Sequence, residues 1–206
     1  LKIRRIYDMI PSNLESKKKR VVFQDIEDKR GKRFSDYQDE FEYLISAGIA
    51  LDVNAITTPV FPLTQSVGKN LLKLYLNDVG LLTDVLYGSN IRAILDDETG
   101  INLGSVYESV VAQELAAHGY KLFYYDNRSK GEVDYLIDDY DSLSAIPIEV
   151  KSGKDYTVHS ALSTFIKNDD YHVKKAFVLS NTREITTNGK ITYLPIYDVM
   201  FLQNNS

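Results

Sequence analysis

The sequence predicts an α/β protein in which a mixed sheet is covered by helices on both faces. Segments with the apolar spacing of helices and short runs with the two-residue period of strands follow the order α-β-β-β-α-β, with one further strand. The composition over 206 residues, 44% hydrophobic and 26% charged, is that of a globular protein that can bury a core. The absence of Cys excludes disulfides and thiolate metal sites. No run of about 18 apolar residues occurs, so we expect no membrane span and a cytoplasmic location.

Residues 1–60 are expected to form a winged-helix-like segment. The first ten positions have helical spacing of apolar residues, and Pro11 is expected to end that helix. A second helix is predicted from an N-cap at Ser35 to Gly48, and residues 49–56 then alternate like a strand.

Residues 61–100 are expected to connect this segment to the rest of the chain. The expected elements are a hairpin or linker over 57–68, a strand over 71–76, a helix over 78–87 capped by Asn77 or Asp78, and a polar loop over 88–100. This region therefore contributes a hairpin and one short helix.

Residues 101–206 give the clearest pattern. The expected elements are a helix over 105–118 that begins at Ser105 and closes at Gly119, strands over 122–125, 132–138 and 145–151, a helix over 159–167, and strands over 174–179 and 190–194. Because only a short acidic turn joins the second and third of these strands, we expect them to be adjacent and antiparallel.

Charge is unevenly distributed along the chain. The net charge of −5 argues against indiscriminate nucleic-acid binding. Residues 1–60 carry 11 basic and 10 acidic residues, whereas residues 61–206 carry 13 and 19. Two basic clusters occur, at residues 17–20 and at Lys29, Arg30, Lys32 and Arg33. Two interpretations stay open for them: solvated loop charge, or contacts to the phosphates of DNA.

Two of the predicted strands carry acids where apolar residues are usual. Glu149 and Lys151 share one face of their strand, and Asp134 is expected to share a face with Glu132 and Leu136. Pairing across the acidic turn is expected to place Asp134 beside Glu149, with Lys151 close to both.

Converging carboxylates repel each other unless a cation lies between them. Hard oxygen ligands favour Mg²⁺ or Mn²⁺, and the Val150 carbonyl is a candidate for a further ligand. An ammonium such as that of Lys151 orients an attacking water and offsets charge on a phosphoryl group. The pattern therefore predicts metal-assisted phosphodiester hydrolysis. The simpler alternative is that Lys151 only neutralises Glu149 at a solvent-facing strand end.

The helix over 105–118 supplies two more candidate acids. Its expected buried stripe consists of Tyr107, Val110, Val111 and Leu115. Glu114 falls within this stripe and Glu108 at its edge, although Glu114 could bond a nearby Lys and Glu108 could reach solvent. The three histidines, His118, His159 and His172, lack ligand spacing and are expected at the surface or at helix caps.

Together these motifs resemble the PD-(D/E)XK nuclease superfamily, above all the archaeal Holliday-junction resolvases. The likeness covers residues 104–180 and includes the stretches GSVYE, GEVD and IEVK. It implies a restriction-endonuclease-like αβββαβ domain within residues 101–206. By position it implies that Glu108 is the helix acid, Asp134 and Glu149 bind the metal, and Lys151 is catalytic.

Two departures from the superfamily pattern are visible. Val133 stands where the nominal signature has Pro, and no Gln appears in the helix after Lys151. The four candidate catalytic positions are intact.

The chain as a whole is similar to the C-terminal part of a group of prokaryotic AAA-type ATPases. LKLYLNDVGLL at 72–82 and GSVYESVVAQEL at 104–115 carry this likeness, together with the two strand motifs. It implies an upstream P-loop ATPase domain in the same polypeptide, with which a chain that begins at Leu1 rather than Met agrees. ATP is expected to bind only there, because this chain has no G-x-x-x-x-G-K-[ST].

Two functions therefore stay open. The domain is a Mg²⁺- or Mn²⁺-dependent nuclease acting on DNA, or it is a catalytically silent module that binds DNA or a protein and regulates the ATPase. Nothing in the sequence indicates the oligomeric state.

Overall fold

The computed structural model describes residues 2–88, 90, 92 and 102–204, so most of the loop expected over 88–100 lies outside the described residues. The helices are α1 (Lys2–Glu15), α2 (Gln38–Ser46), α3 (Val79–Tyr87), α5 (Gly104–Ala117) and α6 (Ser160–Ile166), with 3₁₀ turns η1 (Phe23–Ile26), η2 (Phe34–Asp36), η3 (Leu63–Ser66), η4 (Asp169–Tyr171) and η5 (Ile196–Phe201). The strands are β1 (Ala50–Ile56), β2 (Val67–Leu76), β3 (Phe123–Asn127), β4 (Gly131–Asp139), β5 (Ser144–Lys151), β6 (Ala176–Ser180), β7 (Thr186–Asn188) and β8 (Ile191–Pro195).

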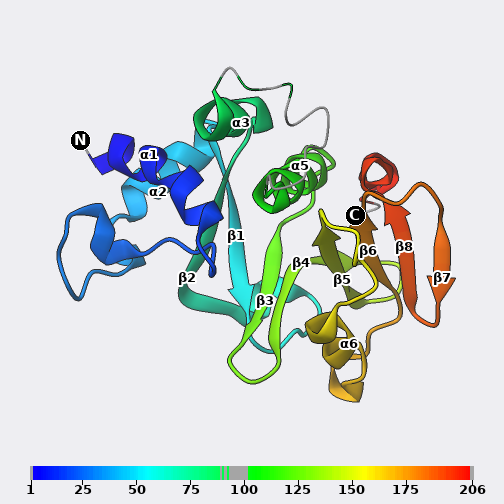
Figure 1. Cartoon of the computed structure of the whole chain (residues 1–206). Coiled ribbons are helices and arrows are strands. Elements are labelled where there is room, and N and C mark those ends of the chain that lie inside the picture. Colours follow the sequence, from blue (N-terminus) through cyan, green and yellow to red (C-terminus); the bar gives the residue numbers. More distant parts are fainter. Residues whose placement is uncertain (1, 89, 91, 93–101, 205–206) are drawn as a thin grey trace.

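The strands of the described residues form one mixed sheet in the order β2-β1-β3-β4-β5-β6-β8-β7 (Figure 1). The predicted antiparallel pairing of β4 with β5 is confirmed, with Ile137 opposite Ile146. The crossovers from β5 to β6 and from β6 to β8 are parallel. The expected mixed α/β fold is therefore confirmed.

The N-terminal elements belong to the same sheet. Strand β1 pairs antiparallel with β2 and parallel with β3, so the hairpin that follows α2 extends the sheet. The sheet is continuous across the expected boundaries at residues 60 and 100. The division into a winged-helix-like segment and a nuclease-like domain stays a prediction.

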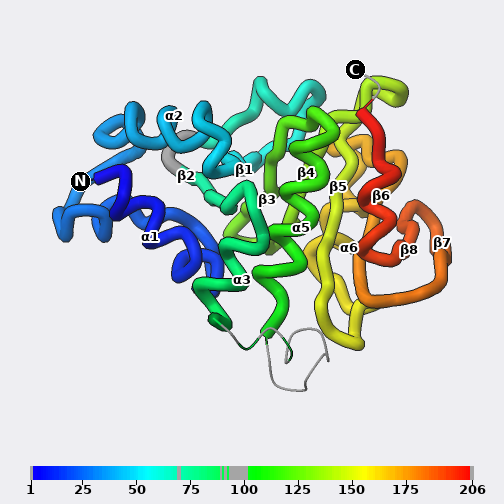
Figure 2. The backbone as a smooth tube through the Cα atoms, turned by 90° about the horizontal axis from the view of Figure 1, so that it is seen from above, coloured from blue at the N-terminus to red at the C-terminus, as the bar shows by residue number. Residues whose placement is uncertain are grey.

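Helices cover both faces of the sheet. Helix α5 and helix α6 lie on opposite sides (Figure 1), and each packs into its own apolar cluster, α5 through Leu115 and α6 through Phe165. Helices α1, α2 and α3 gather at the end of the sheet formed by β2 and β1 (Figure 2). None of the helices in the described part of the chain is long and apolar enough to cross a membrane.

Two expectations about the N-terminal helices are wrong. Helix α1 continues through Pro11 to Glu15, because Pro11 packs on the buried face together with Ile10 and Leu14 and this packing outweighs the lost backbone hydrogen bond. Ser35 is not an N-cap, because it lies inside η2. Helix α2 begins only after Tyr37, which occupies the N-cap position and is fully buried.

The later caps agree better with the sequence. Asp78 caps α3 by accepting a hydrogen bond from the Gly80 N–H at 2.7 Å. Gly119 closes α5 with a φ of 82°, a conformation that glycine adopts without strain. Ser105 was expected as the N-cap of α5, but it lies inside the helix, where its buried hydroxyl donates to Glu15.

Candidate functional site

A β-bulge in β4 sets the position of Asp134. Phe123 of β3 is opposite Leu136 of β4, but Tyr125 is opposite Val133. Between these two pairs β3 advances by two residues and β4 by three, so β4 contains one extra residue. Val133 and Leu136 both pack in the cluster of α6, whereas Tyr135 packs in the cluster of α5. Bulges of this kind change the direction of side chains and are common beside active sites.

The bulge overturns one expectation. Asp134 does not share a face with Leu136, because its carboxylate lies near Glu108 on α5 while Leu136 packs beside α6. Strict alternation fails here because one residue of β4 has no partner on β3.

Asp134 also ends the ladder between β4 and β5. The last paired residues are Tyr135 and Ile148, and beyond them Asp134 Oδ2 accepts a hydrogen bond from the Val150 N–H at 2.8 Å. Burial, and then the negative charges of Glu149 and Glu108, raise the pKa of Asp134 well above its usual range. Val150 thus reaches the site through its N–H, whereas the sequence predicts its carbonyl as a metal ligand.

Glu149 and Lys151 form the expected pair on β5. Lys151 Nζ lies 2.7 Å from Glu149 Oε1, and the Glu149 residue is 6% exposed. The second oxygen, Glu149 Oε2, is buried and has no hydrogen-bond partner among the described residues. Burial raises the pKa of Glu149, and the Lys151 ammonium offsets only part of this effect. Lys151 therefore neutralises a buried acid, rather than an acid at a solvent-facing strand end.

Glu108 is the helix acid that faces the cluster. It is 4% exposed, and both of its carboxylate oxygens are engaged. Tyr75 donates its hydroxyl to Oε2 at 3.0 Å, and Lys19 donates its ammonium to Oε1. The Tyr135 hydroxyl donates to the main-chain carbonyl of Glu108 at 2.8 Å. These contacts fix the acid in one place.

The predicted buried stripe of α5 is confirmed at Val111 and Leu115 and wrong at Tyr107 and Val110. Val106, Val111, Ala112 and Leu115 are buried, whereas Tyr107 and Val110 are only partly buried. The stripe is displaced because α5 is enclosed by the sheet, by α3 and by η5 rather than by the sheet alone. As a result Glu108 is buried and Glu114 is only partly buried.

The basic run at residues 17–20 is not simply solvated loop charge. Lys19 pairs with Glu108, and Arg20 Nη1 lies 2.7 Å from Asp126 Oδ2. Sequence reasoning missed both contacts, and also missed Tyr75 as a partner of Glu108. The only signal for Lys19 was its place in a basic run, which does not identify a partner.

The second basic cluster lies between η1 and η2. Lys29, Arg30 and Arg33 are exposed, and Lys32 Nζ lies 3.4 Å from Asp36 Oδ1. Figures 1 and 2 show this segment beyond the β2 edge of the sheet, away from β4 and β5. The structure does not bring this cluster to the acids.

The histidines differ from expectation at one position. His159 is buried, and its Nε2 lies 2.8 Å from the Tyr193 hydroxyl. It occupies the N-cap position of α6 without a capping bond from its side chain. Within residues 2–88, 90, 92 and 102–204, no group of three or more His, Asp or Glu side chains is arranged to hold a metal ion.

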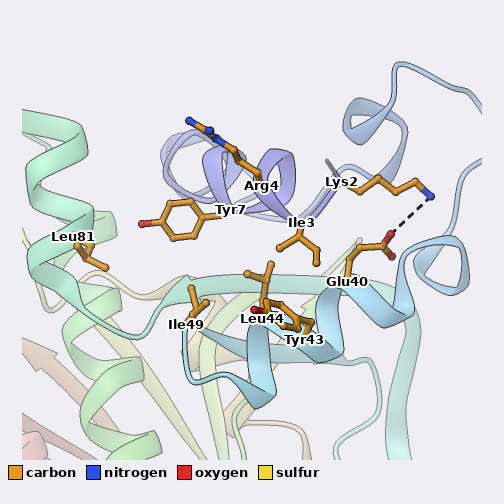
Figure 3. Close-up of a pocket in the computed structure, with 9 residues that line it drawn as sticks. All are labelled: Lys2, Ile3, Arg4, Tyr7, Glu40, Tyr43, Leu44, Ile49 and Leu81. Atoms are coloured by element: carbon orange, nitrogen blue, oxygen red, sulfur yellow. Dashed lines mark ion pairs between the residues drawn. The ribbon is translucent and has the colours of Figure 1, made fainter.

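A separate apolar groove lies between α1, α2 and α3. Its volume is about 850 Å³. Figure 3 shows Ile3 and Tyr7 of α1 facing Leu44 of α2 and Leu81 of α3. None of the predicted site residues lines this groove.

The candidate acids lie in the part of the chain that is similar to a known domain family. Residues 103–199 match the model of a domain of unknown function, DUF4143. No curated protein and no solved structure matches the chain. The matched segment contains Glu108, Asp134, Glu149 and Lys151, and it runs from α5 to the middle of η5.

Proposed function

We propose that residues 103–199 carry a divalent-cation-dependent phosphodiesterase site that acts on DNA. The observation that carries the proposal is Glu149 Oε2, a buried carboxylate oxygen without a partner among the described residues. An unsatisfied acceptor of this kind is costly unless it meets a cation or a donor. Asp134, whose pKa is raised by burial and by the charge of Glu149, would be the second carboxylate ligand of that cation.

The carboxylates of Asp134 and Glu149 fit a hard divalent ion, whereas the carboxylate of Glu108 is already occupied. Asp134 and Glu149 would hold Mg²⁺ or Mn²⁺, since carboxylate oxygens are the ligands these ions prefer. Such an ion supplies Lewis-acid polarisation of a phosphoryl oxygen. Glu108 is not free to join them, because Lys19 and Tyr75 occupy its oxygens.

Lys151 would stabilise negative charge on a phosphoryl group. Burial lowers the pKa of Lys151, but Glu149, Asp134 and Glu108 together raise it above its ordinary value, so the ammonium stays charged at neutral pH. Its side chain is 30% exposed and so is accessible to a substrate. The Val150 N–H, for its part, keeps Asp134 directed toward β5.

Calorimetric titration with Mn²⁺ tests the ion site. Asp134→Asn and Glu149→Gln should each weaken binding about tenfold or more, because each removes one charged ligand. Glu114→Gln is the matched control on α5 and should bind like the wild type. Equal binding by all four proteins would refute the site.

Cleavage of branched and single-stranded DNA tests the chemistry. Lys151→Met should retain Mn²⁺ binding and lose cleavage by about 10²-fold or more. Cleavage at the wild-type rate by Lys151→Met would contradict the role of the ammonium.

The second candidate function is a catalytically silent module that binds DNA or a protein next to an AAA-type ATPase domain. The neutralised Glu108 favours it, because an acid held by Lys19 and Tyr75 is less available to a metal. The sequence resemblance and the DUF4143 match support this placement in an ATPase polypeptide. Neutralising Lys29, Arg30, Lys32 and Arg33 together should then weaken DNA binding and reduce its salt dependence. An unchanged salt slope would exclude these residues from the interface.

A further inference from the structure

The basic run at residues 17–20 is held in a defined turn after helix α1. The Ser16 hydroxyl accepts a hydrogen bond from the Lys19 N–H at 3.1 Å. The Val21 N–H, just after the run, donates to the Leu72 carbonyl of β2 at 2.9 Å. Because hydrogen bonds lie on both sides of the run, its backbone has a fixed position beside the sheet.

The four basic side chains of this run differ in their surroundings. Those of Lys19 and Arg20 are partly buried, and each is paired with an acid. Those of Lys17 and Lys18 are exposed, and within the described part of the chain no acid pairs with them. The turn therefore presents two ammonium groups that are free to meet an external anion.

The end of α1 is linked to the candidate site through the first turn of α5. Glu15, the last residue of α1, accepts a hydrogen bond from the Ser105 hydroxyl. The neighbouring Gly104 lies against Ser152, since a side-chain carbon at Gly104 would be 3.9 Å from the Ser152 hydroxyl oxygen. Ser152 directly follows Lys151. Figure 2 accordingly shows the end of α1, the start of α5 and the segment after β5 on one side of the molecule.

The cations on this side suit an extended and flexible polyanion. Lys17 and Lys18 are exposed, whereas the side chain of Lys151 is 30% exposed and therefore recessed. A nucleic-acid strand can contact the exposed pair and still reach the recessed lysine, but a flat lipid surface would meet only the exposed pair. Glu108 and Asp126, the acids nearest the turn, are neutralised by the inner half of the run and so repel such a strand less.

We propose that Lys17 and Lys18 bind the phosphate backbone of a DNA strand that reaches Lys151. This role rests on the proposed function and extends its site to a segment outside the matched residues 103–199. The two lysines are positioning residues, because they hold the strand away from the phosphodiester that Lys151 meets.

Fluorescence anisotropy of the full chain with a labelled single-stranded DNA tests the contact, with no divalent metal present so that no cleavage occurs. The double variant Lys17→Gln, Lys18→Gln should weaken binding about tenfold or more at about 0.1 M salt. The slope of log K against log salt should fall by about 1.4, because each phosphate contact on a single strand contributes about 0.7.

Lys174→Gln with Lys190→Gln is the matched control. It removes the same charge from two exposed lysines that precede β6 and β8. Because Lys151 is opposite Ser180, the last residue of β6, these lysines lie at the other end of the parallel strands. The control should keep the wild-type affinity and salt slope.

The possible results separate this role from the proposed function. Wild-type affinity and salt slope in the Lys17, Lys18 double variant overturn the role of these lysines, and so does equal weakening by the control pair. The Mn²⁺ titration of Asp134→Asn and Glu149→Gln still decides the ion site in either case. No DNA binding by the wild type, with or without binding to vesicles of anionic lipid, also overturns the role.

Amine labelling of the wild-type protein gives a test that needs no variant. Single-stranded DNA at a saturating concentration should reduce the acetylation of Lys17 and Lys18 several-fold, because phosphates cover their ammonium groups. Lys174 and Lys190 should be acetylated as in the free protein, and mass spectrometry of the peptides measures both pairs. Equal acetylation of Lys17 and Lys18 with and without DNA would overturn the proposal.

Discussion

The buried pair of Lys73 and Glu132 should respond very differently to the loss of either partner. Lys73 is fully buried in β2, its ammonium contacts Glu132, and it lies 4.5 Å from the centre of the Tyr124 ring. The side chain of Glu132 is 30% exposed. Glu132→Gln would leave a buried ammonium without water and without its paired carboxylate. Lys73→Met would leave a carboxylate that water reaches.

The expected cost follows from this asymmetry. Removing one partner of a buried ion pair costs about 3–5 kcal/mol when the other charge stays buried. The amide oxygen introduced by Glu132→Gln and the Tyr124 ring retain part of the stabilisation, so this substitution should cost about 3 kcal/mol. Lys73→Met keeps most of the packing and should cost about 1 kcal/mol. At about 2–4 °C per kcal/mol for a chain of this length, Tm should fall by about 6–12 °C in Glu132→Gln.

Urea unfolding followed by far-UV circular dichroism measures the difference. The double variant Lys73→Met, Glu132→Gln should be more stable than Glu132→Gln alone, because it no longer buries an unpaired charge. Glu184→Gln, an exposed acid elsewhere, is the control and should change stability by less than about 0.5 kcal/mol. A cost of Lys73→Met equal to or above that of Glu132→Gln would refute the reasoning.

Three further outcomes are expected. Burial, followed by the charges of Glu149 and Glu108, raises the pKa of the Asp134 carboxyl in the folded protein. The stability that this carboxyl contributes is therefore complete below its unfolded pKa of about 4 and is lost as the pH rises through its folded pKa. Asp134→Asn should flatten that decline in urea midpoints measured against pH, and an unchanged slope would contradict the assignment. Tyr75→Phe leaves Glu108 Oε2 without its phenol donor and should cost about 1–3 kcal/mol in urea unfolding; a cost below about 0.5 kcal/mol would show that the bond contributes little. Phe165→Ala removes a fully buried ring whose centre lies 4.8 Å from the centre of the Tyr125 ring, and it should cost about 3–5 kcal/mol. Phe201→Ala, at an exposed position, should be almost neutral in the same assay.

Most of the sheet can be predicted from the sequence, because the pairing of strands joined by short turns depends on residues that are close together in the chain. A short turn between two strands requires antiparallel neighbours, so the pairing of β4 with β5 follows without knowledge of the rest of the fold. The direction of the Asp134 side chain cannot be predicted in this way. It depends on the register between β3 and β4, where Tyr125 meets Val133 and Phe123 meets Leu136. Alternation along β4 alone contains no sign of that shift.

Contacts between distant segments are also invisible in a local pattern. The acids of the candidate site are recognisable because they interrupt apolar strands and one helix. Their partners are not, since Lys19 and Tyr75 reach Glu108 across 89 and 33 residues of sequence. A lysine in a basic run and a tyrosine in an apolar strand each have many ordinary roles, and only the tertiary arrangement selects one.

These ion pairs change how the net negative charge of residues 61–206 bears on phosphate binding. Counted by segment, the excess of acids argues against contact with a phosphate backbone. In the structure, however, Lys19 and Arg20 of the first segment neutralise Glu108 and Asp126, and Lys73 neutralises Glu132. The field that a phosphate meets depends on these nearby pairs rather than on the sum over a segment, because exposed charges further than about 10 Å away are largely screened by salt. The surplus of acids is therefore compatible with the proposed phosphodiesterase site, in which the partly exposed Lys151 would be the cation that contacts the phosphate.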